Sequence, residues 1–494
     1  MKKILYFLAF SFCVLAPGCV EDTGNYSYEN AEAFIPKVLT EFEDNYNLTI
    51  LQQFSLDPKV EGNESDYEYL WYAYPTMLAA VRPDTLSRER KLDCTITQSP
   101  GSYTIVFVVT DKEHKTAAYR KTTMSVSSVF GVGYYVEKYE NGQTDVDFVD
   151  RKGEVNPNIL SAINGEGIPG RPVNTSYASS QVGFRFQVKD EDGETVQLSS
   201  VPTFIVCTDE DMRIYNGDDM QLIKKYEDAF MEVPAVRKPM GVIATSVGFM
   251  LNNDNAIHLL STSSYMGSFG YAFPGDYRIR YLVNGTNGFL SHDDNSGLFL
   301  GYTAGRNTPV TEATYKDYEL IFFAAQPMQM FISYYSYAVL RHKTTGEARV
   351  VQLYSIYVGA AGLVYYQSEV PAPRDAGMLD ASVFALGGTG KSVIYYSNGD
   401  NEVHYYNYSN QIEKKSAVTL PDGEKIVYMK NVSDIALGPE IFLVLSNKDG
   451  KWMLRVYDFE GATHDIKLPA RETHSGNGDA STVVYRDANT YITY

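Results

Sequence analysis

The residue types that most often carry out catalysis are present in this chain, but they do not stand at catalytic spacings. The seven histidines are His114, His258, His292, His342, His404, His464 and His474. None belongs to an HExxH motif or another spacing typical of zinc sites, and no G-x-S-x-G motif marks a serine nucleophile. A glycosidase needs only two carboxylates at the right distance, so acidic residues alone leave a hydrolase open. We predict no catalytic residues, no metal and no cofactor.

Three further stretches resemble ligand-binding loops but are better explained as turns. The GGTGK stretch at 387–391 lacks the spacing of a phosphate-binding loop and lies between predicted strands. The stretches HDDNSG (292–297) and SNGDNE (397–402) cluster oxygen ligands that suit Ca²⁺, but they lack the full twelve-residue loop. His258 and His404 lie in the second strands of predicted hairpins, where we expect them to be structural.

Cys19 is the residue with the clearest chemical prediction. Lys2 and Lys3 precede the apolar run ILYFLAFSFCVLA, and the small residues APG lead directly to the cysteine. The pattern resembles a bacterial lipoprotein signal, although Leu15 stands one position too early. The alternative is a secretory signal with an accidental cysteine. We predict a signal peptide at 1–18, a lipidated Cys19 and a tether at 19–30.

The acidic pair after Cys19 predicts where the protein is sent. Glu21 and Asp22 resemble the export signal of Bacteroidetes lipoproteins, which implies the outer membrane with the protein facing the cell exterior. Acyl chains hold a protein at a bilayer without crossing it, and no second apolar run of about 18 residues follows. The only expected membrane contact is therefore the lipid anchor.

The net charge limits the classes of partner, and the cysteine content limits the possible disulfides. The chain has 494 residues and a formal net charge of −19, which argues against nucleic acid and against anionic lipid surfaces. Cys13 falls in the signal and Cys19 carries lipid, which leaves Cys94 and Cys207. Each lies in an apolar, strand-like stretch (LDCTI and FIVCT), so we predict two unpaired core cysteines in preference to a disulfide.

Residues 31–128 are predicted to form a small β-sandwich. Short strand-like runs alternate with turns, and Tyr103, Ile105, Phe107 and Val109 alternate as one packed face. Trp71 is expected to anchor the core.

The same region carries a family resemblance. GNYSYEN, YEYLWYAY, TLSRERKLD and PGSYTIVFVVTD follow one another in the order found in the PKD-like lipoproteins of Bacteroidetes, and PKD modules are Ig-like sandwiches. The resemblance implies a surface lipoprotein that works as an accessory of a SusC/SusD-like outer-membrane importer. Asp84-Thr85-Leu86 also resembles an O-glycosylation site of these bacteria, at Thr85.

Residues 130–494 repeat one theme, a strand, a polar turn and a second strand. Clear examples are SVIYYSNGDNEVHYYNYSNQ (392–411) and IFLVLSNKDGKWMLRVYDFEG (441–461). Such repetition indicates a propeller, a solenoid or stacked sandwiches. The length suits about seven blades, so we predict an all-β chain with an Ig-like sandwich followed by a β-propeller-like domain, although no WD or kelch signature is present.

Three functions follow as hypotheses. The first is a non-catalytic accessory of a SusC/SusD-type nutrient importer that binds or presents a peptide or oligosaccharide, with peptide favoured because tryptophan is scarce. The others are a surface hydrolase and a purely structural partner of the importer. Two tyrosine-rich stretches, SSYMGSFGY (263–271) and ISYYSY (332–337), supply the candidate ligand-binding residues, with blade packing as the alternative. These residues are Tyr265, Phe269, Tyr271, Tyr334, Tyr335 and Tyr337.

Overall fold

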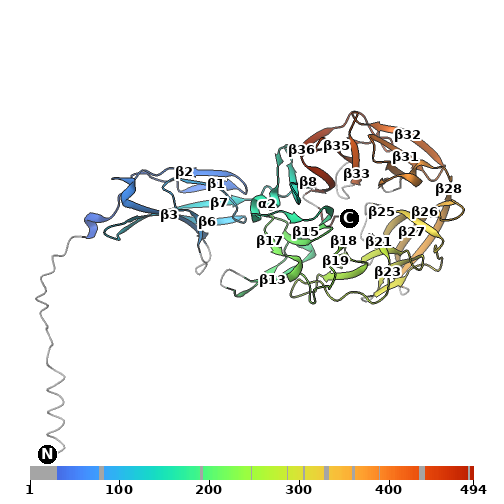
Figure 1. Cartoon of the computed structure of the whole chain (residues 1–494), viewed down its shortest axis with the longest axis horizontal. Helices are drawn as coiled ribbons and strands as arrows, with labels where there is room; N and C mark the ends of the chain where they lie inside the picture. The colour runs from blue at the N-terminus through green and yellow to red at the C-terminus, as the bar shows by residue number, and fades with distance from the viewer. Residues whose placement is uncertain are drawn as a thin grey trace, which may run out of the picture.

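A computed structural model shows an all-β protein with two parts, a sandwich and a closed ring of sheets (Figure 1). The described residues are 31–76, 83–189, 193–245, 247–285, 288–303, 306–326, 333–358, 362–388, 390–432, 440–487 and 490–493. Cys19 and the rest of the predicted signal and tether lie outside them. The predicted fold class, an Ig-like sandwich followed by a propeller-like domain, is confirmed.

The sandwich consists of two sheets. The larger has the strand order β1-β7-β6-β3-β4, and the smaller pairs β2 with β5. Its strands are β1 (Asn45–Thr49), β2 (Gln53–Leu56), β3 (Tyr67–Pro75), β4 (Asp84–Ser87), β5 (Leu92–Thr95), β6 (Gly101–Asp111) and β7 (Ala117–Ser127), with the short helices η1 (Ala31–Phe34) and η2 (Glu64–Asp66).

Trp71 is the core anchor that the sequence predicted. Its side chain is 0 % exposed, and its ring stacks on Phe107 at 4.4 Å between centroids. The indole Nε1 donates a hydrogen bond to the carbonyl of Arg90 at 3.1 Å. Burial of the large ring is therefore possible without an unsatisfied polar group.

The ring contains seven sheets in the described part of the chain, which we number as blades 1 to 7. Blade 1 contains β37 (Asp479–Arg486), β8 (Gly133–Glu140), β9 (Gln143–Asp150), β10 (Val155–Asn156) and β11 (Ile168–Pro169). Blade 2 contains β12 (Pro172–Ala178), β15 (Thr203–Thr208), β16 (Met212–Asn216) and β17 (Leu222–Lys224), and blade 3 contains β18 (Pro239–Thr245), β19 (Gly248–Asn253) and β20 (Ala256–Ser261). Blade 4 contains β21 (Ile279–Gly285), β22 (Gly288–Asp293), β23 (Leu298–Thr303) and β24 (Arg306–Pro309), and blade 5 contains β25 (Tyr318–Ala325), β26 (Ser333–His342), β27 (Ala348–Val358) and β28 (Gly362–Ala372). Blade 6 contains β29 (Val383–Leu386), β30 (Val393–Ser397), β31 (Glu402–Asn407) and β32 (Ile412–Thr419), and blade 7 contains β33 (Lys425–Val432), β34 (Ile441–Lys448), β35 (Lys451–Asp458) and β36 (Glu472–Asn477).

Smaller elements connect or decorate the blades. They are α2 (Ile159–Asn164), η3 (Ser180–Val182), η4 (Tyr226–Asp228), η6 (Gly377–Asp380) and the hairpin of β13 (Arg185–Lys189) with β14 (Thr195–Ser199).

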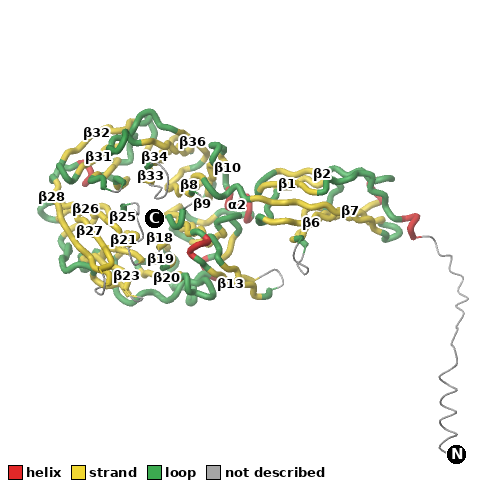
Figure 2. The backbone as a smooth tube through the Cα atoms, turned by 180° about the vertical axis from the view of Figure 1, so that it is seen from behind, coloured by secondary structure: helices red, strands yellow, loops and turns green. Residues whose placement is uncertain are grey.

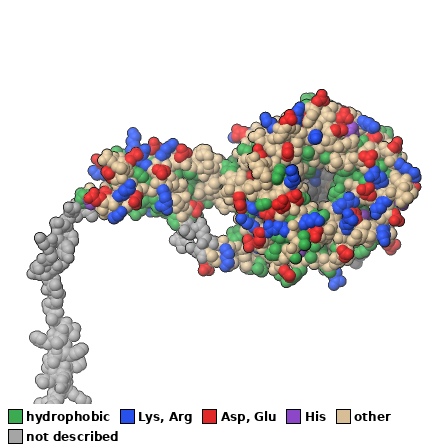
Figure 3. Space-filling model, in the orientation of Figure 1, with side chains coloured by type: hydrophobic (Ala, Val, Ile, Leu, Met, Phe, Trp, Pro, Cys, Tyr) green, Lys and Arg blue, Asp and Glu red, His purple; other side chains and the backbone are tan. Residues whose placement is uncertain are grey.

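The ring is closed by the two ends of the propeller sequence. The inner strands contact one another in the order β12, β18, β21, β25, β29, β33 and β37, and β37 contacts β12 again. Because β37 pairs antiparallel with β8, the last strand becomes the inner strand of the first blade. Figures 1 and 2 show this ring from both sides, and Figure 3 shows a hollow near its centre with acidic and basic side chains around it.

Tight turns explain the repeated hairpins. Asn141 and Gly142 both have positive φ, of 53° and 86°, as do Asp449 and Gly450, with 52° and 69°. Positive φ at both central residues is the geometry of the type I′ turn, which matches the twist of paired strands. The Asn-Gly and Asp-Gly signals in the sequence therefore correspond to real hairpins.

Each blade is covered on both faces by its neighbours. All six residues of β15 are buried, as are all six of β19, which gives continuous buried runs where a half-exposed sheet would alternate. Asparagine side chains add hydrogen bonds between blades. Asn174 donates to the carbonyl of Val242 at 2.6 Å and accepts from its N–H at 2.9 Å, and Asn447 bonds Ala480 in the same way.

The sandwich and the ring share one apolar core. Phe130, after the last sandwich strand, packs edge-on against Phe148 of β9 at 5.5 Å. Gln221 Nε2 donates to the carbonyl of Thr97 in the sandwich at 3.1 Å, and Asn164 of α2 donates to Met220 at 2.9 Å. Blades 1 and 2 therefore form the surface on which the sandwich packs.

Candidate functional site

The first tyrosine-rich stretch lies at the outer edge of blade 3. Tyr265 and Tyr271 are 63 % and 66 % exposed, whereas Phe269 is 0 % exposed. Phe269 packs against Phe230 at 5.4 Å, and its backbone accepts a hydrogen bond from Met231 N–H at 2.9 Å. For Phe269, the structure shows the blade-packing alternative, because a buried ring cannot contact a ligand.

The exposed tyrosines belong to a larger apolar surface, which we call the blade 3 patch. It is formed by two segments, 229–238 and 262–275, joined by the hydrogen bond between Met231 and Phe269. The segment 262–275 is also held by Lys224, whose Nζ donates to the Met266 carbonyl at 2.9 Å. The exposed apolar side chains of the patch are Met231, Val233, Val236, Tyr265, Met266 and Tyr271. Exposed apolar side chains on neighbouring, hydrogen-bonded segments make this surface a candidate docking site.

The second stretch lies on β26 in blade 5. Tyr337 is buried and packs against Tyr408 of blade 6 at 5.1 Å, which is again blade packing. The Tyr334 side chain lies outside the described part of the structure. Tyr335 is half-buried and faces the same side of the sheet as Tyr337.

Tyr335 begins a row of stacked rings, which we call the tyrosine ladder. Tyr335, Tyr354 and Tyr366 are directly opposite one another on β26, β27 and β28. Their centroids are 4.5 Å and 6.2 Å apart, with interplanar angles of 21° and 27°. The outermost ring, Tyr366, is 53 % exposed. Sequence reasoning found only Tyr335, because the three tyrosines become neighbours only through strand pairing.

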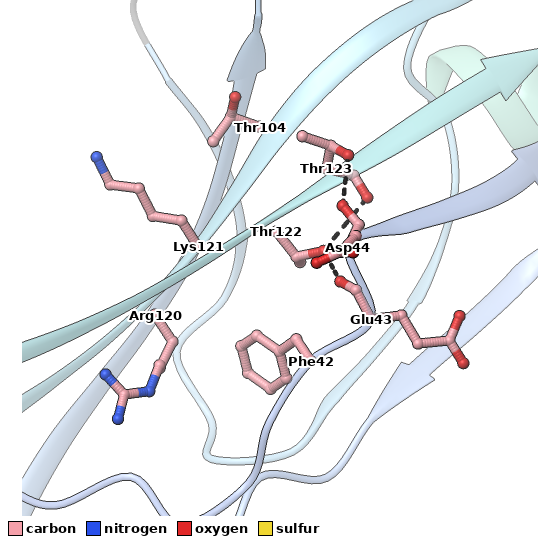
Figure 4. Close-up of a pocket in the computed structure, with 8 residues that line it drawn as sticks. All are labelled: Phe42, Glu43, Asp44, Thr104, Arg120, Lys121, Thr122 and Thr123. Atoms are coloured by element: carbon pink, nitrogen blue, oxygen red, sulfur yellow. Dashed lines mark hydrogen bonds between the residues drawn. The ribbon is translucent and has the colours of Figure 1, made fainter.

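One depression lies in the sandwich (Figure 4). Its volume is about 240 Å³, below the usual range for small-molecule sites. Thr122 Oγ1 donates to the carbonyl of Glu43 at 2.5 Å, and Thr123 Oγ1 donates to that of Asp44 at 2.7 Å. These bonds attach segment 42–44 to β7. The lining residues are Phe42, Glu43, Asp44, Thr104, Arg120, Lys121, Thr122 and Thr123.

Thr85, the predicted glycosylation residue, is exposed on β4. The structure thus leaves it accessible, and its modification stays a prediction.

The histidine and cysteine predictions agree with the structure. His258 is buried, its Nδ1 donates to the Gly270 carbonyl at 2.9 Å, and burial lowers its pKa. His404 Nδ1 accepts from the N–H of Ser416 at 2.9 Å. Cys94 and Cys207 are unpaired, and burial raises the pKa of both thiols.

The loops that resemble ligand-binding motifs are turns between strands. Asp293, in HDDNSG, accepts hydrogen bonds from the N–H groups of Arg278, Asn295 and Ser296 within its own blade. In the stretch 387–391, Thr389 lies outside the described residues; Gly388 follows β29, Lys391 precedes β30, and the N–H of Lys391 donates to the Gly388 carbonyl at 2.9 Å. Within the residues that the structure describes, no cluster of three potential metal ligands is found. Helices long and apolar enough to cross a bilayer are likewise not found among those residues.

Glu137 of β8 is the most unusual ionisable group. It is buried between blades 1 and 2, where the hydroxyl of Thr175 faces it, and burial raises its pKa to about 8. Neither carboxyl oxygen has a hydrogen-bond partner of normal geometry. Burial removes the water that would stabilise the ionised carboxylate, and no cation among the described residues takes its place. The neutral form is therefore favoured, and the pKa of Glu137 rises.

Two buried cations of blade 1, Lys138 and Arg486, have partners other than Glu137. Lys138 Nζ lies 3.0 Å from Asp147 Oδ1, and Trp452 Nε1 donates to Asp147 Oδ2 at 2.9 Å. Arg486 of β37 donates to the hydroxyls of Tyr135 and Tyr177 at 3.1 and 2.9 Å. It also donates to the Gly217 carbonyl at 2.7 Å. The first set of contacts joins blades 1 and 7 and the second joins blades 1 and 2, so both stabilise the closure of the ring, and we assign neither a ligand.

Comparison with known proteins supports the two-part architecture. The chain resembles the crystal structure of a quinoprotein alcohol dehydrogenase-like protein from Bacteroides thetaiotaomicron, with a TM-score of 0.52 and 12 % identity. The match covers 92 % of this chain and 99 % of that one. At this identity the likeness shows the fold alone.

Two other solved structures match the chain less closely. Hsv2 of Kluyveromyces lactis matches with a TM-score of 0.33 and 14 % identity over 53 % of this chain and 71 % of that one. YCF48 of Cyanidioschyzon merolae matches with a TM-score of 0.33 and 10 % identity over 65 % and 94 %. No curated protein matches the sequence.

The family comparison concerns the N-terminal part. Residues 19–172 match the PKD-like family, a range that begins at Cys19, includes the whole sandwich and ends at the first residue of β12. The N-terminal third of this chain is thus PKD-like, and it is followed by a seven-bladed β-propeller-like ring.

Proposed function

We propose that this protein is a lipid-anchored lipoprotein on the outer face of the outer membrane. In this proposal it is a non-catalytic accessory of a SusC/SusD-like importer and binds or presents peptide or oligosaccharide cargo. The PKD-like match and the resemblance of residues 1–18, followed by Cys19, to a lipoprotein signal support this placement.

The observation that carries the proposal is the blade 3 patch. It exposes two tyrosines and two methionines, residue types that are enriched at protein interfaces. Its two segments are fixed by hydrogen bonds to the blade, so the surface is formed before any partner arrives. We assign this patch as the surface that docks on the importer.

An affinity pull-down from detergent-solubilised outer membranes tests the docking. Tagged wild-type protein should co-purify with a SusC/SusD-like pair, and the triple variant Tyr265→Ser, Met266→Ser, Tyr271→Ser should not. Ile412→Ser on β32 is the matched control, because Ile412 is similarly exposed but lies on blade 6. If no such pair co-purifies with wild-type protein, the accessory role is wrong. If the triple variant retains the pair, the patch is not the docking surface.

Membrane fractionation tests the anchor separately. The variant Cys19→Ala should move from the membrane fraction to the soluble fraction, whereas Cys94→Ala should not. Continued membrane association of Cys19→Ala contradicts lipid anchoring at this residue. Turnover of peptides or glycans by the purified protein contradicts the non-catalytic role.

A further inference from the structure

The tyrosine ladder has an open end at the rim of the ring. Tyr335 is half-buried in the seam with blade 6, Tyr354 stacks on it, and Tyr366 is the outermost ring. Tyr366 lies on β28, which both views of the chain place on the outer rim (Figures 1 and 2). A further strand beside β28 would place a side chain directly on the outer face of this ring.

β28 offers an unusually long edge for such a strand. It spans eleven residues and pairs with β27 along its whole length without a register shift. Among the described residues, no strand pairs with its other edge. The outer strands of the other blades span at most eight residues in the described chain, as in β32.

β28 has few of the features that usually protect an edge strand, namely one charged residue and one proline, Pro371, next to its last position. Its one charged residue is Glu369, whose Oε2 lies 2.6 Å from Nη1 of Arg349. Because Glu369 is three positions from Tyr366, it lies on the opposite face of the sheet. By contrast, β32 carries Glu413, Lys414 and Lys415 and has a register shift. Charges and bulges of this kind prevent strand addition in natural sheets.

The residue that follows on the ladder face is polar and uncharged. Ser368 is two positions from Tyr366, and its Oγ donates to Gln352 Oε1 at 3.0 Å. Gln352 in turn donates to the hydroxyl of Tyr337 at 2.8 Å. An added strand would therefore meet an aromatic ring and, two residues along, a hydrogen-bonding group.

We propose that the free edge of β28 binds an extended peptide as an additional strand of blade 5. An aromatic side chain of the peptide stacks on Tyr366, and a polar side chain two residues away faces Ser368. Backbone hydrogen bonds supply the affinity and the alternate side chains supply the preference, as in other cases of strand addition. This inference rests on the proposed binding role and gives it a ligand class.

Peptide binding to the full-length protein in detergent tests the proposal. The probe is a fluorescently labelled heptapeptide with a central tyrosine flanked by threonine and serine, measured by anisotropy. Tyr366→Ala should weaken binding about threefold to tenfold, the range expected for one aromatic pair. Tyr366→Phe should bind like wild type, and so should Ile412→Ala on the edge of blade 6. A probe that is N-methylated at every residue should not bind, because neither of its edges keeps the required donors.

Three results would overturn the proposal. Equal binding of the N-methylated probe would show that no strand is added. Tyr366-dependent binding of malto- or xylo-oligosaccharides, without peptide binding, would assign the ladder to a sugar. Concentration-dependent dimers that are lost in Tyr366→Ala would assign the edge to a second copy of the chain. The importer pull-down tests the blade 3 patch and does not involve Tyr366. The pull-down and the peptide-binding assay can therefore fail independently of each other.

Discussion

Replacing Glu137 by glutamine should change how the stability of the ring depends on pH. The carboxyl has an ordinary pKa of 4.5, and burial raises it to about 8 in the folded protein. Below pH 4.5 the group is protonated in both the folded and unfolded states, so it has no effect. As the pH rises towards 8, the unfolded state ionises and gains stability that the folded state cannot match. The wild-type free energy of unfolding therefore falls over this window.

The size of the effect follows from the pKa difference. Each pKa unit corresponds to about 1.4 kcal/mol, so the carboxyl lowers the free energy of unfolding by up to about 3 kcal/mol between pH 4.5 and pH 7. Glu137→Gln keeps the shape but cannot ionise. A constant offset is expected from new contacts of the amide with Thr175, but this offset does not depend on pH. The stability difference between variant and wild type should therefore grow by up to about 3 kcal/mol from pH 4.5 to pH 7.

Urea denaturation at several pH values measures this difference. Trp452 lies in blade 7 and Trp71 in the sandwich, so their fluorescence reports both parts of the chain. Glu312→Gln is the control, because Glu312 is exposed, and its difference from wild type should be nearly constant with pH. Parallel pH profiles for wild type and Glu137→Gln would refute the reasoning, since they would mean that Glu137 titrates alike in both states.

Three further changes have expected outcomes. Trp452→Phe removes the hydrogen bond to Asp147 and part of the ring, and should lower the free energy of unfolding by about 2–4 kcal/mol in urea denaturation; an unchanged midpoint would contradict it. Arg486→Met leaves two phenol hydroxyls and a buried carbonyl without their donor, and should cost about 2–4 kcal/mol. Arg486→Lys should recover part of this loss, and no recovery would mean that the charge is irrelevant. In a thiol-reagent assay without denaturant, half-buried Cys94 should react faster than fully buried Cys207, whose reaction should require unfolding; equal rates would be inconsistent with the structure.

The hairpins and the sandwich core could be predicted from the sequence because each depends on a few neighbouring residues. Asn141-Gly142 and Asp449-Gly450 have positive φ at both residues, and each closes a two-residue hairpin. Trp71 was identifiable as a core residue because it stands on the packed face of an alternating strand. The number of blades followed from length divided by the size of a repeat.

Features that join distant segments could not be read in the same way. Nothing around Asp479 indicates that β37 pairs with β8, because the pairing is decided by ring geometry. Tyr366 and Tyr354 gain their importance from strand register, which the sequence does not display. The burial of Phe269 could not be predicted either, because it is an aromatic residue in the same stretch as Tyr265 and Tyr271. Those two are exposed, whereas Phe269 packs inside the blade.

The pairing of β37 with β8 also determines the order in which the ring can assemble. As the chain emerges from its N-terminal end, β8 is made early, but its inner partner is made more than three hundred residues later. Until then β8 presents an open edge, which is a site for wrong pairing with other chains. The sandwich strands β1 to β7 are all made before the ring is complete, so the intermediate contains every sandwich strand and an unpaired edge at β8. Assistance by a chaperone is therefore expected to matter most in the interval before the final strand arrives.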